Sequence, residues 1–134
     1  MKRSARSKAA HSPHQGPEKK VLCVCTDGLL RSPTMAHMLH ATYGYNTRSA
    51  GIRESVALQS VDDVLIEWAD EIVCTDPTVR DRLLAIYKVP ENKTIVTLNI
   101  ADRYGYMELY LRRLIRTQYT EWLDNHGKRI YRTK

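Results

Sequence analysis

A cysteine and an arginine separated by five residues follow a segment that is predicted to be a buried strand. The segment CTDGLLRS runs from Cys25 through Arg31 to Ser32. Because Gly28 lies inside it, the backbone can curl so that its N–H groups converge on a tetrahedral anion such as phosphate. The same groups favour a thiolate at Cys25, and Arg31 offers a planar fork that can grip two oxygens of the anion. The pattern therefore predicts nucleophilic chemistry on a phosphate group. The predicted phosphate-binding loop consists of Thr26, Asp27, Gly28, Leu29, Leu30, Arg31 and Ser32.

The spacing by itself is weak evidence, because a second cysteine-to-arginine pair with the same spacing begins at Cys74. In this second copy, Asp76 and Pro77 are typical of a helix N-cap and first turn, so no open loop is left to surround an anion. In the first copy, Pro33 is expected to delay the helix until after Ser32. We therefore take the first copy as the candidate site and assign Cys74 to packing.

Strands and helices alternate along the chain from residue 21 onward. The run VLCVC at 21–25 is typical of a strand buried on both faces, and further strands are predicted at 46–49, 71–74 and 94–100. Helical patterns begin near Pro33, cover 61–68, begin again at Pro77 and extend over about 106–124. This alternation predicts an α/β fold, a four-stranded parallel sheet flanked by helices on both faces. Ligands of such sheets bind beyond the carboxyl ends of the strands, where Cys25 lies.

The charges divide the 134-residue chain into three parts. Residues 1–20 hold six Lys and Arg against one acid and lack large aliphatic residues after Met1, which predicts a disordered basic N-terminal arm. Residues 127–134 form a basic tail with four Lys and Arg. The two ends together carry a net charge of +9, whereas the whole chain carries only +6. The predicted single domain at 21–126 is therefore slightly acidic. Nucleic acid is therefore not an expected partner.

The cysteines and the hydropathy indicate the compartment. Cys23, Cys25 and Cys74 cannot all be paired, which indicates a reducing, cytoplasmic location. No run approaches the roughly 18 apolar residues of a membrane span, so no membrane association is expected. We expect neither a metal nor another cofactor, because the chain lacks a second pair of closely spaced cysteines and its histidines lie in unrelated settings.

The segment VLCVCTDGLLRSPTMA resembles the active-site segment of the low-molecular-weight protein tyrosine phosphatases, especially a compact bacterial branch of predicted phosphatases. The resemblance continues through Ser49-Ala50-Gly51, through Trp68-Ala69-Asp70 and into 98–104, and so covers nearly all of 21–122. It implies the strand order 2-1-3-4. It also implies that Cys25 attacks phosphorus, Arg31 binds the phosphate, Ser32 assists the thiolate and Asp102 protonates the leaving group.

An acid such as Asp102 is also expected on chemical grounds, because a phenolate leaving group needs a proton. Tyr104 and Tyr106 are candidates for an aromatic wall beside the substrate ring, and Ser49 for a supporting residue. The expected substrate is a phosphotyrosine-containing protein or a small aryl phosphate. Inorganic phosphate, sulfate or vanadate is expected to bind in the same loop.

Several positions depart from the pattern of the larger family. The chain has Asp27-Gly28 where Gly-Asn is common, Leu30 where many members have a second cysteine, and Arg103 where a proline usually follows the acid. Three alternatives therefore stay open: an arsenate reductase-like protein, a phosphocarrier-like protein, and a catalytically weak or inactive module that binds phosphate or phosphopeptides.

Overall fold

Four parallel strands form the sheet, as the sequence predicts. The computed structural model describes residues 18–26, 30–52 and 60–127. The strand order is β2-β1-β3-β4, and all three pairs of neighbours are parallel. The strands are β1 (Lys20–Cys25), β2 (Asn46–Gly51), β3 (Glu71–Cys74) and β4 (Thr94–Thr97). The α/β class and the strand order are therefore confirmed.

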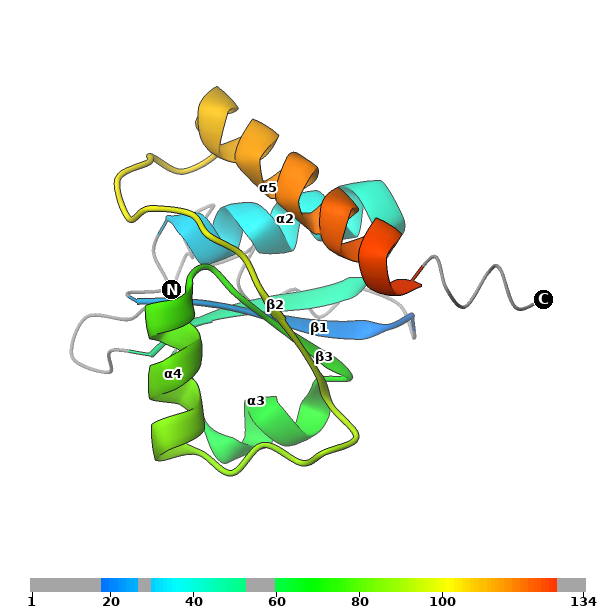
Figure 1. Ribbon diagram of the computed structural model, residues 1–134, viewed down its shortest axis with the longest axis vertical. Helices are drawn as coiled ribbons and strands as arrows, with labels where there is room; N and C mark the ends of the chain where they lie inside the picture. Colours follow the sequence, from blue (N-terminus) through cyan, green and yellow to red (C-terminus); the bar gives the residue numbers. More distant parts are fainter. Residues whose placement is uncertain (1–17, 27–29, 53–59, 128–134) are drawn as a thin grey trace, which may run out of the picture.

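Helices cover both faces of the sheet, which was also predicted. Figure 1 shows α2 (Arg31–Tyr43) and α5 (Leu109–Trp122) on one side, and α3 (Asp63–Trp68) and α4 (Pro77–Ile86) on the other. A short π-helix, Leu123–Gly127, directly follows α5. No helix within these described ranges is long and apolar enough to cross a membrane.

The central strand β1 is apolar from Val21 to Cys25 because both of its faces are covered. Val21 and Cys23 point into the core under α2 and α5, whereas Leu22 and Val24 point into the core under α3 and α4. Every residue from Val21 to Cys25 is buried. The strand therefore holds Cys25 at the carboxyl edge of a rigid, fully packed element.

Two aspartates cap the helices on the same face of the sheet. The Asp62 side chain accepts a hydrogen bond from the Leu65 N–H at 2.8 Å, and Asp76 accepts one from the Val79 N–H at 2.9 Å. Each satisfies an N–H group at the start of its helix that has no partner within the helix. The predicted Asp76 cap is confirmed.

Several element boundaries differ from the predictions: β1 begins one residue earlier, β2 ends at Gly51 and not at residue 49, and α3 begins at Asp63 and not at residue 61. Helix α2 begins at Arg31, although Pro33 was expected to delay it, because a proline within the first turn removes an N–H that has no helical partner anyway. Strand β4 ends at Thr97, but bonds to the end of β3 continue through the Leu98 and Ile100 N–H groups. Helix α5 begins at Leu109, after a short irregular segment.

Some predictions concern residues outside the described ranges. These include the arm up to residue 17, the tail from residue 128, and Asp27, Gly28 and Leu29 of the loop. Two lysines that the prediction assigned to the arm are described with the fold. Lys20 opens β1, and Lys19 donates from Nζ to Glu71 at 2.8 Å.

Candidate functional site

Cys25 ends β1 and contacts the first turn of α2. Its side chain is buried, and Sγ lies 3.0 Å from the Ser32 hydroxyl oxygen. That hydroxyl also lies 3.4 Å from the carbonyl oxygen of Ala50 on β2. A serine hydroxyl at this distance can donate to a thiolate and stabilise its charge. The structure therefore places the predicted nucleophile and its predicted helper together.

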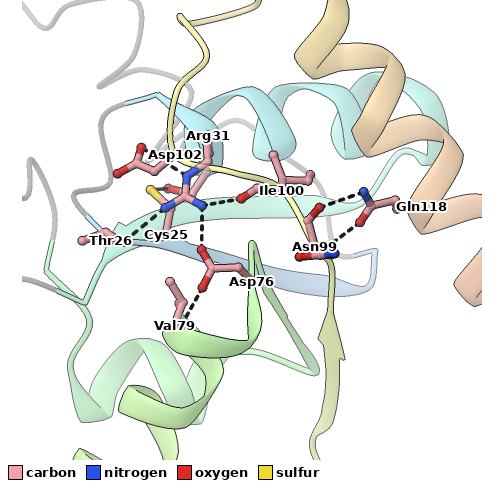
Figure 2. Close-up of polar contacts among 10 residues, drawn as sticks. Cys25, Thr26, Arg31, Asp76, Val79, Asn99, Ile100, Asp102 and Gln118 are labelled. Carbon is pink, nitrogen blue, oxygen red and sulfur yellow. Dashed lines mark hydrogen bonds and ion pairs between the residues drawn. The ribbon is translucent and has the colours of Figure 1, made fainter.

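Arg31 lies beside Cys25 with its guanidinium held on one side by protein oxygens. Although charged, the residue is only 1% exposed. Its NH1 nitrogen donates to Asp76 Oδ2 and to the carbonyl oxygen of Ile100, both at 2.7 Å. Its NH2 nitrogen donates to the Thr26 hydroxyl at 3.2 Å. These three contacts come from β3–α4, from the segment after β4, and from the loop after β1, and they fix the plane of the guanidinium (Figure 2).

The other edge of the guanidinium makes fewer contacts with protein atoms. Arg31 Nε is buried and has no hydrogen-bond partner among the residues that the structure describes. It forms an ion pair with Asp102 Oδ1 at 3.4 Å. The bonds described above use both hydrogens of NH1 and one hydrogen of NH2. The Nε–H and the second NH2 hydrogen form the side-by-side pair of donors that grips two oxygens of a phosphate or carboxylate. Arg31 is therefore anchored through NH1 and can bind an anion through Nε and NH2.

Asp102 faces this edge from the segment after β4. Its side chain is 53% exposed, in contrast to the buried Arg31, so it reaches both the guanidinium and solvent. Figure 2 shows Asp102 and Cys25 on the same side of Arg31. An open pocket lies at this edge of the sheet. Its lining residues are Thr26, Arg31, Asp76, Pro77, Thr78, Asn99, Ile100, Ala101 and Asp102.

Asp76 is the site residue that sequence reasoning missed. The sequence signal, an aspartate before a proline, explained its cap on α4, and one carboxylate oxygen does accept from the helix. The other oxygen binds Arg31, which is 45 residues earlier in the chain. Only the pairing of β1 with β3 brings the two loops together.

The second cysteine-to-arginine pair does not form a site of this kind. Burial raises the pKa of the Cys74 thiol to about 12, so that it is protonated at neutral pH. Burial, together with the nearby Glu71, also raises the pKa of Cys23. Arg80 instead pairs with the exposed Asp81 at 2.9 Å. The assignment of Cys74 to packing therefore agrees with its buried position under α4.

The predicted supporting residues lie in different settings. Tyr104 is only 7% exposed, and its ring packs in the core and against Tyr110. Tyr106 is partly exposed. Ser49 is buried on β2, and within the described ranges its hydroxyl oxygen has no hydrogen-bond partner. The exposed Tyr110, which the sequence analysis did not single out, presents an accessible ring next to Tyr104.

Titratable side chains are too dispersed for a metal centre in the part of the chain that the structure describes. No group of three His, Cys, Asp or Glu side chains there could hold a metal ion. The positive charge at the site comes instead from Arg31, which lies between Asp76 and Asp102.

Comparison with solved structures identifies the fold. Wzb from Vibrio vulnificus, solved in complex with benzylphosphonate, matches with a TM-score of 0.65 over 80% of this chain and 98% of its own, at 19% identity. The chain has the fold of the low-molecular-weight phosphotyrosine phosphatases.

Two further structures agree with this assignment of the fold. A low-molecular-weight phosphotyrosine phosphatase from Vibrio cholerae O395 matches with a TM-score of 0.59 over 83% of this chain and 98% of its own, at 19% identity. The YwlE arginine phosphatase from Geobacillus stearothermophilus matches with a TM-score of 0.59 over 86% and 94%, at 18% identity. No family model and no curated protein matches the sequence.

Proposed function

We propose that the protein belongs to the low-molecular-weight phosphatase family and hydrolyses phosphotyrosine or a similar aryl phosphate through a cysteinyl-phosphate intermediate. The observation that carries this proposal is the arrangement around Arg31. One side of its guanidinium is fixed by Asp76 and by the Ile100 carbonyl, and the other side faces Asp102 beside Cys25. The side chains proposed as nucleophile, phosphate binder and acid therefore all come from the carboxyl edge of the sheet, where ligands of such folds bind.

In the first chemical step, the phosphate replaces the Asp102 carboxylate at Arg31 Nε and receives two hydrogen bonds from the guanidinium edge. The Cys25 thiolate attacks phosphorus, so that an S–P bond forms while the P–O bond to the aryl group breaks. In this proposal, the Ser32 hydroxyl, which lies 3.0 Å from the sulfur, turns its hydrogen from the Ala50 carbonyl oxygen to the thiolate. Asp102, carrying a proton, transfers it to the leaving phenolate oxygen.

In the second step, Asp102 acts as the base. Its carboxylate takes a proton from a water molecule, whose oxygen attacks phosphorus as the S–P bond breaks. Inorganic phosphate leaves and the thiolate is restored. The partial exposure of Asp102 suits both steps, because the group must reach Arg31, the leaving group and water.

The backbone amides of residues 26–32 supply the remaining donors in this proposal. The sequence predicts that these N–H groups converge on the transferred phosphoryl group, where they would stabilise the charge that develops on its oxygens. Phosphate, sulfate and vanadate are expected to bind there as well. The reaction needs Cys25 in its reduced form, which fits a reducing compartment such as the cytoplasm.

The buried cysteines weigh against an arsenate reductase reaction. That chemistry needs further thiols that can form a disulfide in relay, but Cys23 and Cys74 are both fully buried. A phosphocarrier or a phosphopeptide-binding module would need neither the Arg31–Asp102 pair nor an acid near the thiol. The gathering of Cys25, Arg31 and Asp102 therefore favours hydrolysis.

The proposal is tested with the purified protein and p-nitrophenyl phosphate. Wild type should release p-nitrophenol, and Cys25→Ser should abolish release while vanadate still binds. Cys74→Val is the matched control, because it removes a thiol that lies outside the site, and it should retain the activity. Equal turnover in wild type and Cys25→Ser would refute the proposal.

A further inference from the structure

The segment that carries Asp102 is held at its start by an unusual pair of hydrogen bonds from α5. The Gln118 side-chain amide accepts from the Asn99 N–H through Oε1 at 2.6 Å and donates to the Asn99 carbonyl oxygen through Nε2 at 3.1 Å. Figure 2 shows the two bonds side by side, with Gln118 reaching from the helix to the backbone after β4. One side chain thus satisfies both polar groups of one backbone residue.

These two bonds occupy the place that a neighbouring strand would take. Strand β4 is at the edge of the sheet. The N–H groups of Leu98 and Ile100 point back toward β3, where they bond the carbonyl oxygens of Cys74 and of the next residue, Thr75, each at 2.9 Å. Because alternate residues of an extended chain point in opposite directions, the Asn99 groups face the open edge. Gln118 supplies the partner that the missing strand would provide. Leu98 and Ile100 are therefore held by hydrogen bonds on the β3 side of the segment, and Asn99 is held on the opposite side by Gln118.

The fixed segment leads directly into the site. The Ile100 carbonyl oxygen accepts from Arg31 NH1, and Asp102 follows two residues later, 3.4 Å from Arg31 Nε. Beyond Asp102, the chain is fixed again where the Met107 N–H donates to the Thr34 hydroxyl at 2.9 Å. Asp102 is therefore carried on a short span between two anchors, one on α5 and one on α2.

We infer that Gln118 is a positioning residue for the general acid: its amide holds the backbone at Asn99 and thereby sets the distance of Asp102 from the leaving group. This inference rests on the proposed function. The usual family proline after the acid is replaced here by Arg103, so the segment lacks the rigidity that a proline ring gives. Arg31 itself depends less on Gln118, because Asp76 and Thr26 also hold it.

The test compares Gln118→Met, which preserves length but removes both hydrogen bonds, with wild type. Thr117→Ala is the matched control, because Thr117 is an exposed neighbour on α5. For phenyl phosphate, whose leaving group needs protonation, kcat/KM should fall about 10-fold in Gln118→Met, because kcat/KM reports only the steps up to loss of the leaving group. For p-nitrophenyl phosphate, kcat/KM should change less than about 2-fold, and vanadate affinity should be retained, because Arg31 keeps its other anchors. Thr117→Ala should match wild type in all three measurements.

A double substitution separates positioning from a general loss of structure. In the Asp102→Asn background, Gln118→Met should have no further effect on kcat/KM for phenyl phosphate, because the acid it positions is absent. Equal losses of kcat/KM for both substrates, or the same loss in the Asp102→Asn background, would overturn the inference. Amide exchange at Asn99 should become faster in Gln118→Met, and unchanged exchange would also overturn it. Absence of Cys25-dependent turnover in wild type would instead refute the proposed function.

Discussion

Asp76 links Arg31 to the start of α4 through its two carboxylate oxygens. Oδ2 accepts from Arg31 NH1 at 2.7 Å, while Oδ1 accepts from the Val79 N–H at 2.9 Å. The guanidinium that is proposed to bind phosphate is thus fixed to the N-terminus of a helix packed on the opposite face of the sheet from its own helix, α2. The same residue contributes to stability and to the geometry of the site.

Asp76→Ala should therefore lower both stability and activity, and Asp62→Ala is its matched control. Asp62 caps α3 in the same way, with a 2.8 Å bond to the Leu65 N–H. Loss of either cap should cost about 1 kcal/mol in urea unfolding, and Asp76→Ala should cost about 2 kcal/mol more because it also breaks a charged hydrogen bond. Only Asp76→Ala should lower kcat/KM, by at least about 10-fold, because the guanidinium loses an anchor. Equal kcat/KM in the two variants would contradict the role of Asp76 at the site.

The three thiols should differ in reactivity. Burial raises the pKa of Cys23 and Cys74, so neither is a thiolate at neutral pH. Iodoacetamide should therefore modify only Cys25 in the folded protein and all three cysteines in urea, as read from peptide mass spectra. Phosphate at saturating concentration should protect Cys25. Modification of Cys74 in the folded protein before Cys25 would contradict this assignment.

The buried Cys74 should also make the free energy of unfolding decrease in the alkaline pH range. Its pKa is raised by burial from 9.0 to about 12, so between these values the folded protein keeps a proton that the unfolded chain releases. Since the unfolded state then binds fewer protons, the free energy of unfolding must fall as pH rises above 9.0. Relative to that of wild type, the free energy of unfolding of Cys74→Val should rise by about 1 kcal/mol between pH 7 and pH 10. Ile72→Val, on the same strand, removes no titratable group, and its difference from wild type should stay constant. A constant difference for Cys74→Val as well would contradict the prediction.

Glu71, a buried carboxylate at the amino-terminal end of the strands, should affect the stability of the fold but not the activity. Glu71 is fully buried at the start of β3, where it accepts from Lys19 Nζ and from the Tyr119 hydroxyl, both at 2.8 Å. Tyr119→Phe removes one donor and should cost roughly 1–3 kcal/mol in urea unfolding. The activity should be unchanged, because Cys25 lies at the other end of the strands. Tyr43→Phe changes a partly exposed ring in the same aromatic cluster and should cost less than about 0.5 kcal/mol. Equal stabilities of the two variants would contradict the role of Glu71.

Local features could be predicted from the sequence, because their signals lie within a few residues. The continuous apolar run of β1, the Asp76-Pro77 cap and the apolar stripe of α5 each reflect short-range preferences that the fold preserves. The position of Cys25 at the end of β1 followed from the same reasoning. The strand order followed from the family resemblance and not from the local pattern.

Contacts between distant side chains could not be predicted in this way. The second oxygen of Asp76 and the amide of Gln118 each bond a partner that only the tertiary structure brings near. The prediction that α2 begins after Ser32 was also wrong, because a proline such as Pro33 is tolerated at more than one position in a first helical turn. Such contacts depend on how elements pack, which a single sequence does not encode locally.

The central claim is that Cys25 accepts the phosphoryl group, and it can be tested by trapping the intermediate. Asp102→Asn should slow attack by water on the cysteinyl phosphate, whereas p-nitrophenolate can still leave without receiving a proton, so the intermediate should accumulate. Mixing this variant with p-nitrophenyl phosphate, quenching in acid within milliseconds to seconds and analysing peptides by mass spectrometry should show one phosphoryl group on Cys25. A phosphoryl group on another residue, or hydrolysis by wild type that persists in Cys25→Ser, would contradict the account.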